Sequence, residues 1–251
     1  MKRTFLTLSI ATILLYACKN DDVINTPELT STQACQDNLT AESIFADVGR
    51  IVEEGLQDNG QNKSFPIYSL MNTDTSDVDT LIINFGPDDI FFPNPGGKMR
   101  KGKINITYTG RYRDSLSIIT TTFDNYYVNY NLVQGERVVT NQGRNSNGNI
   151  CFKIDINNVS ITTSNGTINW GSNRVREWVS GESTYLDITD DVYRITGTAS
   201  GNGVNGNDFT MTITDSLNID LGCLPYCVLK SGTAKISPTG YSDRIINYGD
   251  S

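Results

Sequence analysis

The chain has 251 residues, of which 20 are basic and 28 are acidic, so its formal net charge is −8. This acidic balance argues against nucleic acid as a partner, because phosphate backbones attract clusters of lysine and arginine. The sequence contains no histidine, which excludes Ser-His-Asp chemistry, Cys-His chemistry and any metal site with a histidine ligand. Carboxylate chemistry, a Ser-Lys pair or no catalysis remain.

Residues 1–17 have the pattern of a secretory signal peptide. Lys2 and Arg3 precede an apolar stretch over residues 5 to 16, which is shorter than the roughly 20 residues that span a bilayer. Leu15-Tyr16-Ala17-Cys18 at its end resembles the bacterial lipobox, in which the cysteine is acylated and becomes the mature N-terminus. We therefore predict a lipid on Cys18 that anchors the protein to a membrane. The alternative is ordinary signal cleavage beside an unmodified cysteine.

The next segment changes from a polar tether to a helix. Residues 18–38 are polar and show no apolar period, so they are predicted to form a lipidated tether. Thr40 is suited to be an N-cap, with Leu39 and Ile44 placed for a hydrophobic staple, and Gly55 to help end the helix. We predict a helix over residues 41 to 56, within a helix and loop segment of residues 39–79. Its apolar residues at helical spacing are Ile44, Val48, Ile51, Val52 and Leu56.

From residue 80 onward the apolar period changes to two, which is typical of strands with one buried face. Ile104, Ile106 and Tyr108 alternate with polar residues, and the hairpin signals "SNGT" and "GNGVNGND" separate later alternating runs. We predict that residues 80–251 form an antiparallel β domain with meander connections. The fold class is all-β with one N-terminal helix. The sheet is expected either to pair with another sheet as a β-sandwich or to curve strongly and pack on the helix.

Several longer motifs resemble a family of uncharacterised lipoproteins from Bacteroidota. They are "TGRYRD", "TFDNYYVN", "REWVSG", "DDVYRITGTASG" and "INYGD", and they occur in the order of the family. The segment Lys19-Asn20-Asp21-Asp22 is similar to the acidic signal that directs such lipoproteins to the cell surface. The resemblance implies a lipid-anchored protein of the outer membrane that faces the cell surface, with a periplasm-facing anchor as the alternative. It implies no activity.

Apart from Cys18, four cysteines remain. In an exported chain they are expected to form disulfides, with three possible pairings that the sequence does not separate. A four-cysteine zinc site would need two close pairs, and the sequence has one. The four residues are Cys35, Cys151, Cys223 and Cys227.

Two sets of residues are candidates for ligand binding. Arg111 and Arg113 are expected to share one strand face, where they could bind an anionic ligand or pair with acidic residues on neighbouring strands. Aromatic residues could form a flat surface that stacks on sugar rings, or they could be cross-strand pairs in the core. The strongest aromatic candidates are Tyr126, Tyr127, Trp170 and Trp178. Gly171 is expected to interrupt the strand between the two tryptophans.

The segment "REWVSGESTYLDITDD" gathers carboxylates. Asp187, Asp190 and Asp191 could supply oxygen ligands to Ca²⁺. Glu177 and Glu182 could form the carboxylate pair of a carbohydrate-active enzyme. The third interpretation is a solvated acidic loop.

The sequence therefore favours a lipid-anchored outer-envelope protein, a non-catalytic binding or structural module displayed at the cell surface. Its partner beyond the membrane would be a glycan or another envelope protein. No cofactor is expected apart from the candidate Ca²⁺. A carbohydrate-active enzyme that uses a carboxylate pair is the alternative.

Overall fold

The fold is one antiparallel sheet with a helix against one of its faces. The computed structural model describes residues 32–58, 66–71, 78–86, 92–93, 97–184, 187–224 and 228–249. Within these residues the only α-helix is α1 (Gln33–Asp58). Three 3-10 helices lie between strands: η1 (Glu182–Thr184), η2 (Ile188–Asp190) and η3 (Leu221–Cys223). The predicted signal peptide and Cys18 fall outside the described residues.

The strands pair antiparallel in chain order, from β1 at one edge to β12 at the other, and the short β3 pairs with β4 beside this path. This order confirms the predicted all-β fold with one N-terminal helix. The strands are β1 (Ile67–Met71), β2 (Asp79–Asn84), β3 (Phe92–Pro93), β4 (Met99–Tyr108), β5 (Ile118–Val128), β6 (Asn131–Arg144), β7 (Ile150–Thr163), β8 (Gly166–Ser180), β9 (Val192–Asn202), β10 (Asp208–Asp220), β11 (Leu229–Pro238) and β12 (Arg244–Asn247).

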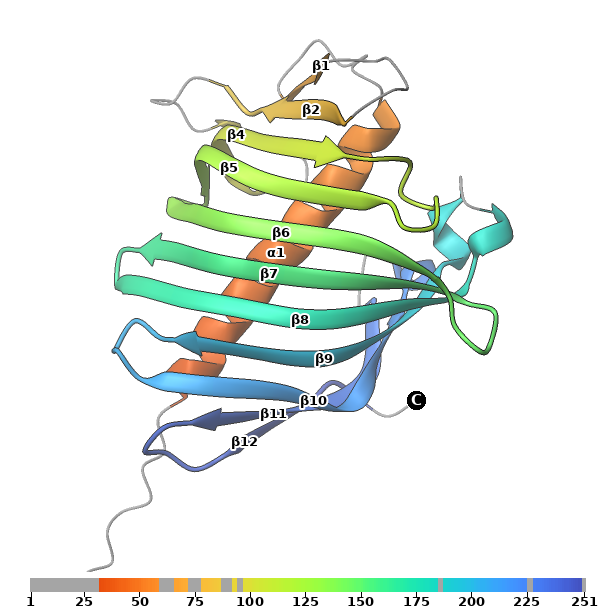
Figure 1. Ribbon diagram of the computed structural model, residues 1–251. Coiled ribbons are helices and arrows are strands. Elements are labelled where there is room, and N and C mark those ends of the chain that lie inside the picture. Colours follow the sequence, from red (N-terminus) through yellow and green to blue (C-terminus); the bar gives the residue numbers. More distant parts are fainter. Residues whose placement is uncertain are drawn as a thin grey trace, which may run out of the picture.

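The helix crosses the strands obliquely on the inner side of the sheet. In Figure 1 it runs behind the strands from the region of β10 up to β2, and its residues contact β2, β8, β10 and β11. Of the two predicted covers for the apolar face, the described residues adopt the helix and not another sheet. A single helix is sufficient only because the sheet curves around it.

The helix begins eight residues before the predicted start, and it takes in residues 33 to 38 that the sequence assigned to the tether. The predicted N-cap is wrong, because the Thr40 hydroxyl donates to the Gln36 carbonyl, 2.8 Å away inside the helix. Leu39, expected in a hydrophobic staple, is 40 % exposed. The buried stripe does continue toward the N-terminus, but Asp37 and Asn38 occupy it. Apolar periodicity did not predict this part of the helix, because polar residues occupy its buried positions.

Side chains on the strands alternate between the helix-facing side and the solvent-facing side. On β4, for example, Ile104 and Ile106 are fully buried while Lys103 and Asn105 lie on the opposite face. The helix contributes the other half of the core with Ala41, Phe45, Val48 and Val52. The core therefore lies in one layer between α1 and the concave face of the sheet.

Arginines extend from this concave face toward the helix. The Arg100 guanidinium donates to the Asp47 carboxylate at 2.6 Å, and the exposed fractions of the two side chains are 1 % and 7 %. Arg174 and Arg176 of β8 bond Glu42 and Glu53 of the helix. These ion pairs connect opposite ends of α1 to strands at the centre and near one edge of the sheet, so they position the helix along its axis.

Gly55 lies inside the helix and not at its end, and it is buried against β1 and β2. A Cβ atom at this position would lie 2.9 Å from Cδ1 of Ile83 and 3.2 Å from Cδ2 of Leu81. The helix backbone therefore approaches the sheet closely at this point. The absence of a side chain at Gly55 permits this close packing. The prediction that Gly55 helps to end the helix was wrong, because the helix continues to Asp58.

Replacing Gly55 by leucine is expected to lower the free energy of unfolding by about 1–3 kcal/mol, because the added side chain overpacks the contact with Ile83 and Leu81. Ala46→Leu, on the exposed side of the same helix, is the matched control and should change stability by less than about 0.5 kcal/mol. Urea titration followed by tryptophan fluorescence measures both. Equal stability of the two variants would contradict the close approach.

The Asp47–Arg100 pair predicts a defined pH dependence. Burial opposes ionisation of Asp47, but the hydrogen bond and charge of Arg100, with Lys98 and Arg50, outweigh it and hold the pKa of this carboxyl below its usual value. A lowered carboxyl pKa adds stability at pH values above about 4, and this stability is lost as the pH falls through the folded-state pKa. Asp47→Asn should cost about 3–5 kcal/mol at pH 7 and much less near pH 3. The control Asp124→Asn, in an exposed pair with Lys103, should cost less than about 1 kcal/mol at either pH.

Candidate functional site

Several of the polar residues singled out in the sequence gather at one end of the sheet. This end cluster consists of the β4–β5 turn (residues 109–117), the β6–β7 hairpin (residues 144–150) and the described part of the β8–β9 connection (residues 181–184 and 187–191). The three segments project at the same end of the strands in Figure 1. They belong to different parts of the chain, and the sheet topology brings them together.

Arg111 and Arg113 do not share a strand face, so that prediction was wrong. β4 ends at Tyr108 and the chain turns, with the amide of Asp114 donating to the Arg111 carbonyl at 2.9 Å. The Asp114 carboxylate accepts from the Arg111 amide at 3.0 Å and from its guanidinium at 3.1 and 3.2 Å. The hydrogen bond from Arg111 lowers the pKa of Asp114. Because the two arginines lie in a turn, they do not present a pair of guanidinium groups on a flat strand face.

Glu182 is held by an arginine of the neighbouring hairpin. The Arg144 guanidinium donates to the two carboxylate oxygens at 2.8 and 2.5 Å, and it also donates to the Gly148 carbonyl at 2.7 Å. The hydrogen bonds and charge of Arg144, together with the charge of Arg113, lower the pKa of Glu182. Glu182 therefore links the β8–β9 connection to the β6–β7 hairpin.

Glu177 on β8 is held in a similar way. Its Oε1 atom accepts from the side-chain amides of Asn149 and Asn145, each at 2.8 Å, and its Oε2 atom accepts from Arg194 at 3.3 Å. The hydrogen bonds from Asn149 and Asn145 lower the pKa of this carboxyl. A glycosidase needs one carboxylic acid with a raised pKa. The pKa values of Glu177 and Glu182 are both lowered.

The three aspartates proposed as calcium ligands accept hydrogen bonds from different partners. Asp187 caps η2 and accepts from the amide and hydroxyl of Thr189, and Asp190 accepts from Thr184. Asp191 points inward, where it accepts from Trp178 Nε1 and the Tyr193 hydroxyl, both at 2.9 Å. No group of three or more Cys, Asp or Glu residues that could hold a metal is found among the described residues. The structure does not bring the three carboxylates around one point.

Asp191 has the only carboxyl pKa in the described chain that is clearly raised, and burial is the main cause. Its role is structural, because it supplies the acceptor for two large aromatic residues of the core. The spacing of the sequence did not reveal this role. The adjacent Asp190 is exposed, and only the tertiary structure distinguishes the two.

The aromatic candidates are mostly core residues, so the proposed flat stacking surface is not formed. Tyr126, Trp170 and Trp178 are 0 %, 4 % and 5 % exposed. β8 runs through Gly171 without a break, and residues an even number apart therefore face the same side, here toward the helix. Tyr127 is the exception, because it lies on the opposite face with the Lys101 ammonium 4.4 Å from its ring centroid.

The described cysteines are free thiols, so no disulfide joins them. Cys35 lies on the helix, Cys151 on β7 and Cys223 in η3. Burial raises the pKa values of Cys35 and Cys151, which lowers their reactivity. Cys227 falls outside the described residues.

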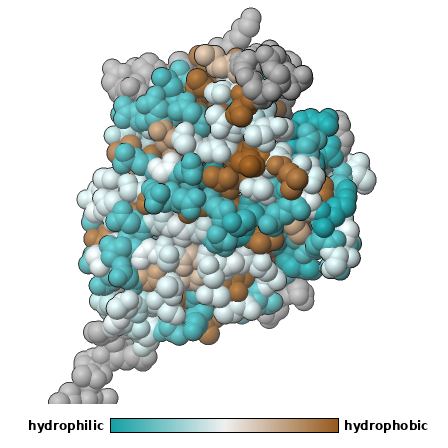
Figure 2. Space-filling view, in the orientation of Figure 1, coloured by the Kyte–Doolittle hydropathy of each residue, from teal (hydrophilic) through white to brown (hydrophobic). Residues whose placement is uncertain are grey.

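Many of the residues on the solvent-facing side of the sheet are short, polar and uncharged. Cross-strand pairing places one row of side chains across β2 and β4 to β12, and threonine is its commonest member. We call this the convex row: Thr80, Thr107, Thr120, Val138, Asp155, Asn173, Thr198, Thr212, Lys235 and Ile245. Figure 2 shows this side, where teal and white surface predominates and a brown area lies near the middle.

Two shallow hollows adjoin each other on this side, with volumes of about 480 and 460 Å³. They share Ser200 and Gly201, and they extend across strands β7 to β11. Hydroxyl and amide groups dominate the residues around them, which include Asn158, Ser160, Asn169, Asn202, Thr210 and Ser237. Small residues line both hollows, Ser200 and Gly201 among them.

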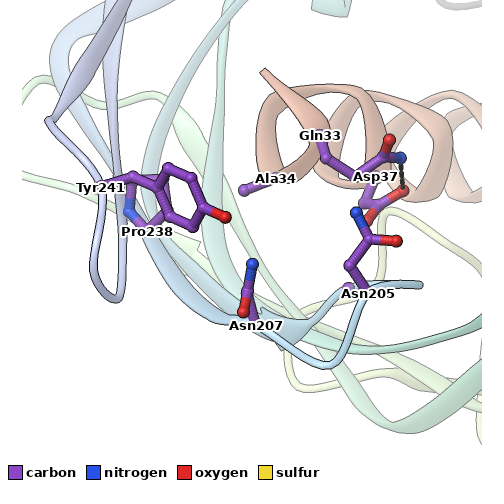
Figure 3. A pocket seen from close by; sticks show the side chains of 8 residues that line it. Gln33, Ala34, Asp37, Asn205, Asn207, Pro238 and Tyr241 are labelled. Carbon is purple, nitrogen blue, oxygen red and sulfur yellow. Dashed lines mark hydrogen bonds between the residues drawn. The ribbon is translucent and has the colours of Figure 1, made fainter. Parts of the chain in front are cut away.

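A smaller cavity of about 10 Å³ lies at the start of the helix. In Figure 3, Tyr241 and Pro238 approach it from one side, and Asn205 and Asn207 of the β9–β10 turn lie beneath the helix. Asp37 accepts from Gln33 at 2.9 Å and from the Val204 amide at 3.0 Å. A volume of this size holds about one water molecule, so the cavity joins the helix to the turn and does not suit a larger ligand.

Comparison with known proteins found nothing similar: no family model, no curated protein and no solved structure matches the chain. Within the described part of the chain, no helix is long and apolar enough to cross a membrane. The resemblance to Bacteroidota lipoproteins therefore remains a prediction.

Asp191 offers a test of the inward orientation of its carboxylate. Asp191→Ala leaves the Trp178 Nε1–H and Tyr193 O–H groups without their acceptor in the core, and we expect a loss of about 1–3 kcal/mol in the free energy of unfolding. Asp190→Ala, next to it and exposed, should have a much smaller effect. Chemical denaturation measures both, and a larger effect at Asp190 would contradict the assigned orientations.

Proposed function

We propose that the protein is a lipid-anchored module of the outer envelope that acts by binding or by structural contact and not by catalysis. The lipid is assigned to Cys18, and the polar segment after it would connect the membrane to the helix and sheet. Display on the outer leaflet is the proposed orientation. This part rests on the lipobox-like sequence and on the acidic residues that follow Cys18.

The proposal of a binding role rests on the polar residues of the convex side. The helix occupies the concave side, so the solvent-facing rows are the broadest surface available to a partner. Three cations on this surface lie beside carboxylates: Lys153 is 2.8 Å from Asp155, Lys235 is 3.0 Å from Asp243, and Arg194 is 3.3 Å from Glu177. A surface with local charge balance and many hydroxyl and amide groups suits a neutral, hydrogen-bonding partner, such as a glycan or a polar envelope protein.

The geometry gives less support to a carbohydrate-active enzyme. Glu177 and Glu182 both accept several hydrogen bonds from donors that favour the ionised form, whereas a general acid must hold a proton near neutral pH. Neither carboxylate lines the two hollows on the convex side. We therefore propose no catalytic residue.

The anchor is tested with the full-length chain expressed in a bacterium that processes lipoproteins. Mass spectrometry of the mature N-terminus should find Cys18 with an attached lipid, and membrane fractionation should find the protein in the outer membrane. Cys18→Ser should move the protein out of the membrane fraction, because acyl chains supply about 0.8 kcal/mol per buried CH₂ group. An unmodified Cys18 in the native chain would contradict the anchor.

Surface display needs a separate experiment, because acylation of Cys18 does not determine which side of the outer membrane the protein faces. Protease added to intact cells should degrade the native protein. Protection until the outer membrane is broken would place the protein on the periplasmic side and leave the lipid assignment intact.

The binding role is tested by placing a long charged side chain on the convex row. Thr198→Arg should preserve the fold and reduce binding to glycan arrays or to envelope extracts at least several-fold. Ser43→Arg, on the exposed side of the helix, is the matched control and should bind as the native protein does. If both variants bind equally well, the convex row is not the contact surface.

A further inference from the structure

Polar residues lie buried where the first turns of α1 contact β8. Trp170 Nε1 donates to Asn38 Oδ1 at 3.0 Å, and one helical turn later the Arg174 guanidinium donates to Glu42. Ser172 lies between Trp170 and Arg174 on the same helix-facing side of β8. Two contacts between the helix and the strand therefore bracket the Ser172 hydroxyl.

Three hydrogen-bond donors remain without a partner among the described residues at this place. They are Asn38 Nδ2, Ser172 Oγ and Arg174 Nη1. The three residues are 0 %, 8 % and 6 % exposed, so water from the outer surface does not satisfy these donors. A buried donor without an acceptor costs about 1–3 kcal/mol, and more when it is charged.

A further guanidinium group faces the helix on a nearby strand. Arg137 of β6 faces the helix and is 5 % exposed. Glu53 acts on Arg137 through its charge, while its carboxylate accepts a hydrogen bond from Arg176. Arg137 belongs to the same cross-strand row as Ser172, two strands away. The interior around Ser172 thus holds a cation that lacks a hydrogen-bonded carboxylate within the described chain.

We propose that Asn38, Ser172 and Arg174 form a binding site for a small monatomic anion of the size of chloride. The amide and guanidinium nitrogens only donate, and the serine hydroxyl can donate as well. An anion accepts from all three groups, whereas a water molecule would also need acceptors for its own two protons. The anion would connect α1 to β8 and supply the acceptor that these three donors lack.

The first test is the thermal unfolding of the mature protein at constant ionic strength, with sodium chloride replacing sodium gluconate. We expect the midpoint to rise with chloride concentration and to level off, because a ligand that binds only the folded state stabilises it in a saturable way. Asn38→Asp keeps an acceptor for Trp170 and places its own carboxylate beside Arg174, so it should abolish the dependence on chloride. Ser200→Ala, on the convex side, should retain it.

The second test is crystallographic and needs no variant. Crystals of the native protein in sodium bromide should show an anomalous peak in contact with Asn38, Ser172 and Arg174. The proposal is overturned if the position is empty or holds water without anomalous signal, or if chloride and gluconate give the same midpoint at every concentration. An equal chloride dependence in native protein and Asn38→Asp would also overturn it.

Discussion

The structure depends on covering the inner face of a wide sheet with one helix. Eleven strands in sequence, at about 4.8 Å per strand, would make a flat sheet about 48 Å across, whereas a helix is only 10–12 Å wide. Two features resolve this mismatch. The helix is long, with 26 residues and therefore about 39 Å, and it crosses the strands obliquely. The sheet curves so that the inward residues of distant strands reach the same helix.

This arrangement explains why the interior contains so many polar groups. Long arginine side chains of β4 and β8 reach from the sheet to carboxylates of the helix. Buried ion pairs add little net stability, because the loss of hydration offsets much of their attraction. We infer that their main effect is to define how α1 lies along the sheet. Arg100, Arg174 and Arg176 do so through Asp47, Glu42 and Glu53.

The same constraint is one reason why we propose the outer face as the contact surface. Because the helix fills the concave side, the residues available to a partner are the outward members of each strand and the turns at both ends. The outward members are mainly hydroxyl and amide residues with locally balanced charges, and the turns of the end cluster satisfy their own carboxylates. For this reason we propose a role in contact and not in catalysis. The proposed anion site lies on the other side of the sheet and would act on stability.

The sequence by itself determined the class of fold and the order of its elements. Alternation of period two from residue 80 onward and helical spacing around Val48 were sufficient, because both signals come from which side chains avoid water. It also singled out Cys18 from its position, and this assignment remains a prediction.

Only the tertiary structure decided the roles of individual polar and aromatic residues, because these depend on neighbours far away in the chain. Asp37 and Asn38 extend the helix because Val204 and Trp170 supply their partners. Trp170 and Trp178 are core residues because β8 continues through Gly171. Arg111 and Arg113 lie in a turn, since Asp114 bonds back to Arg111. Burial and partner distance, which no local pattern encodes, separate a core residue from a binding residue.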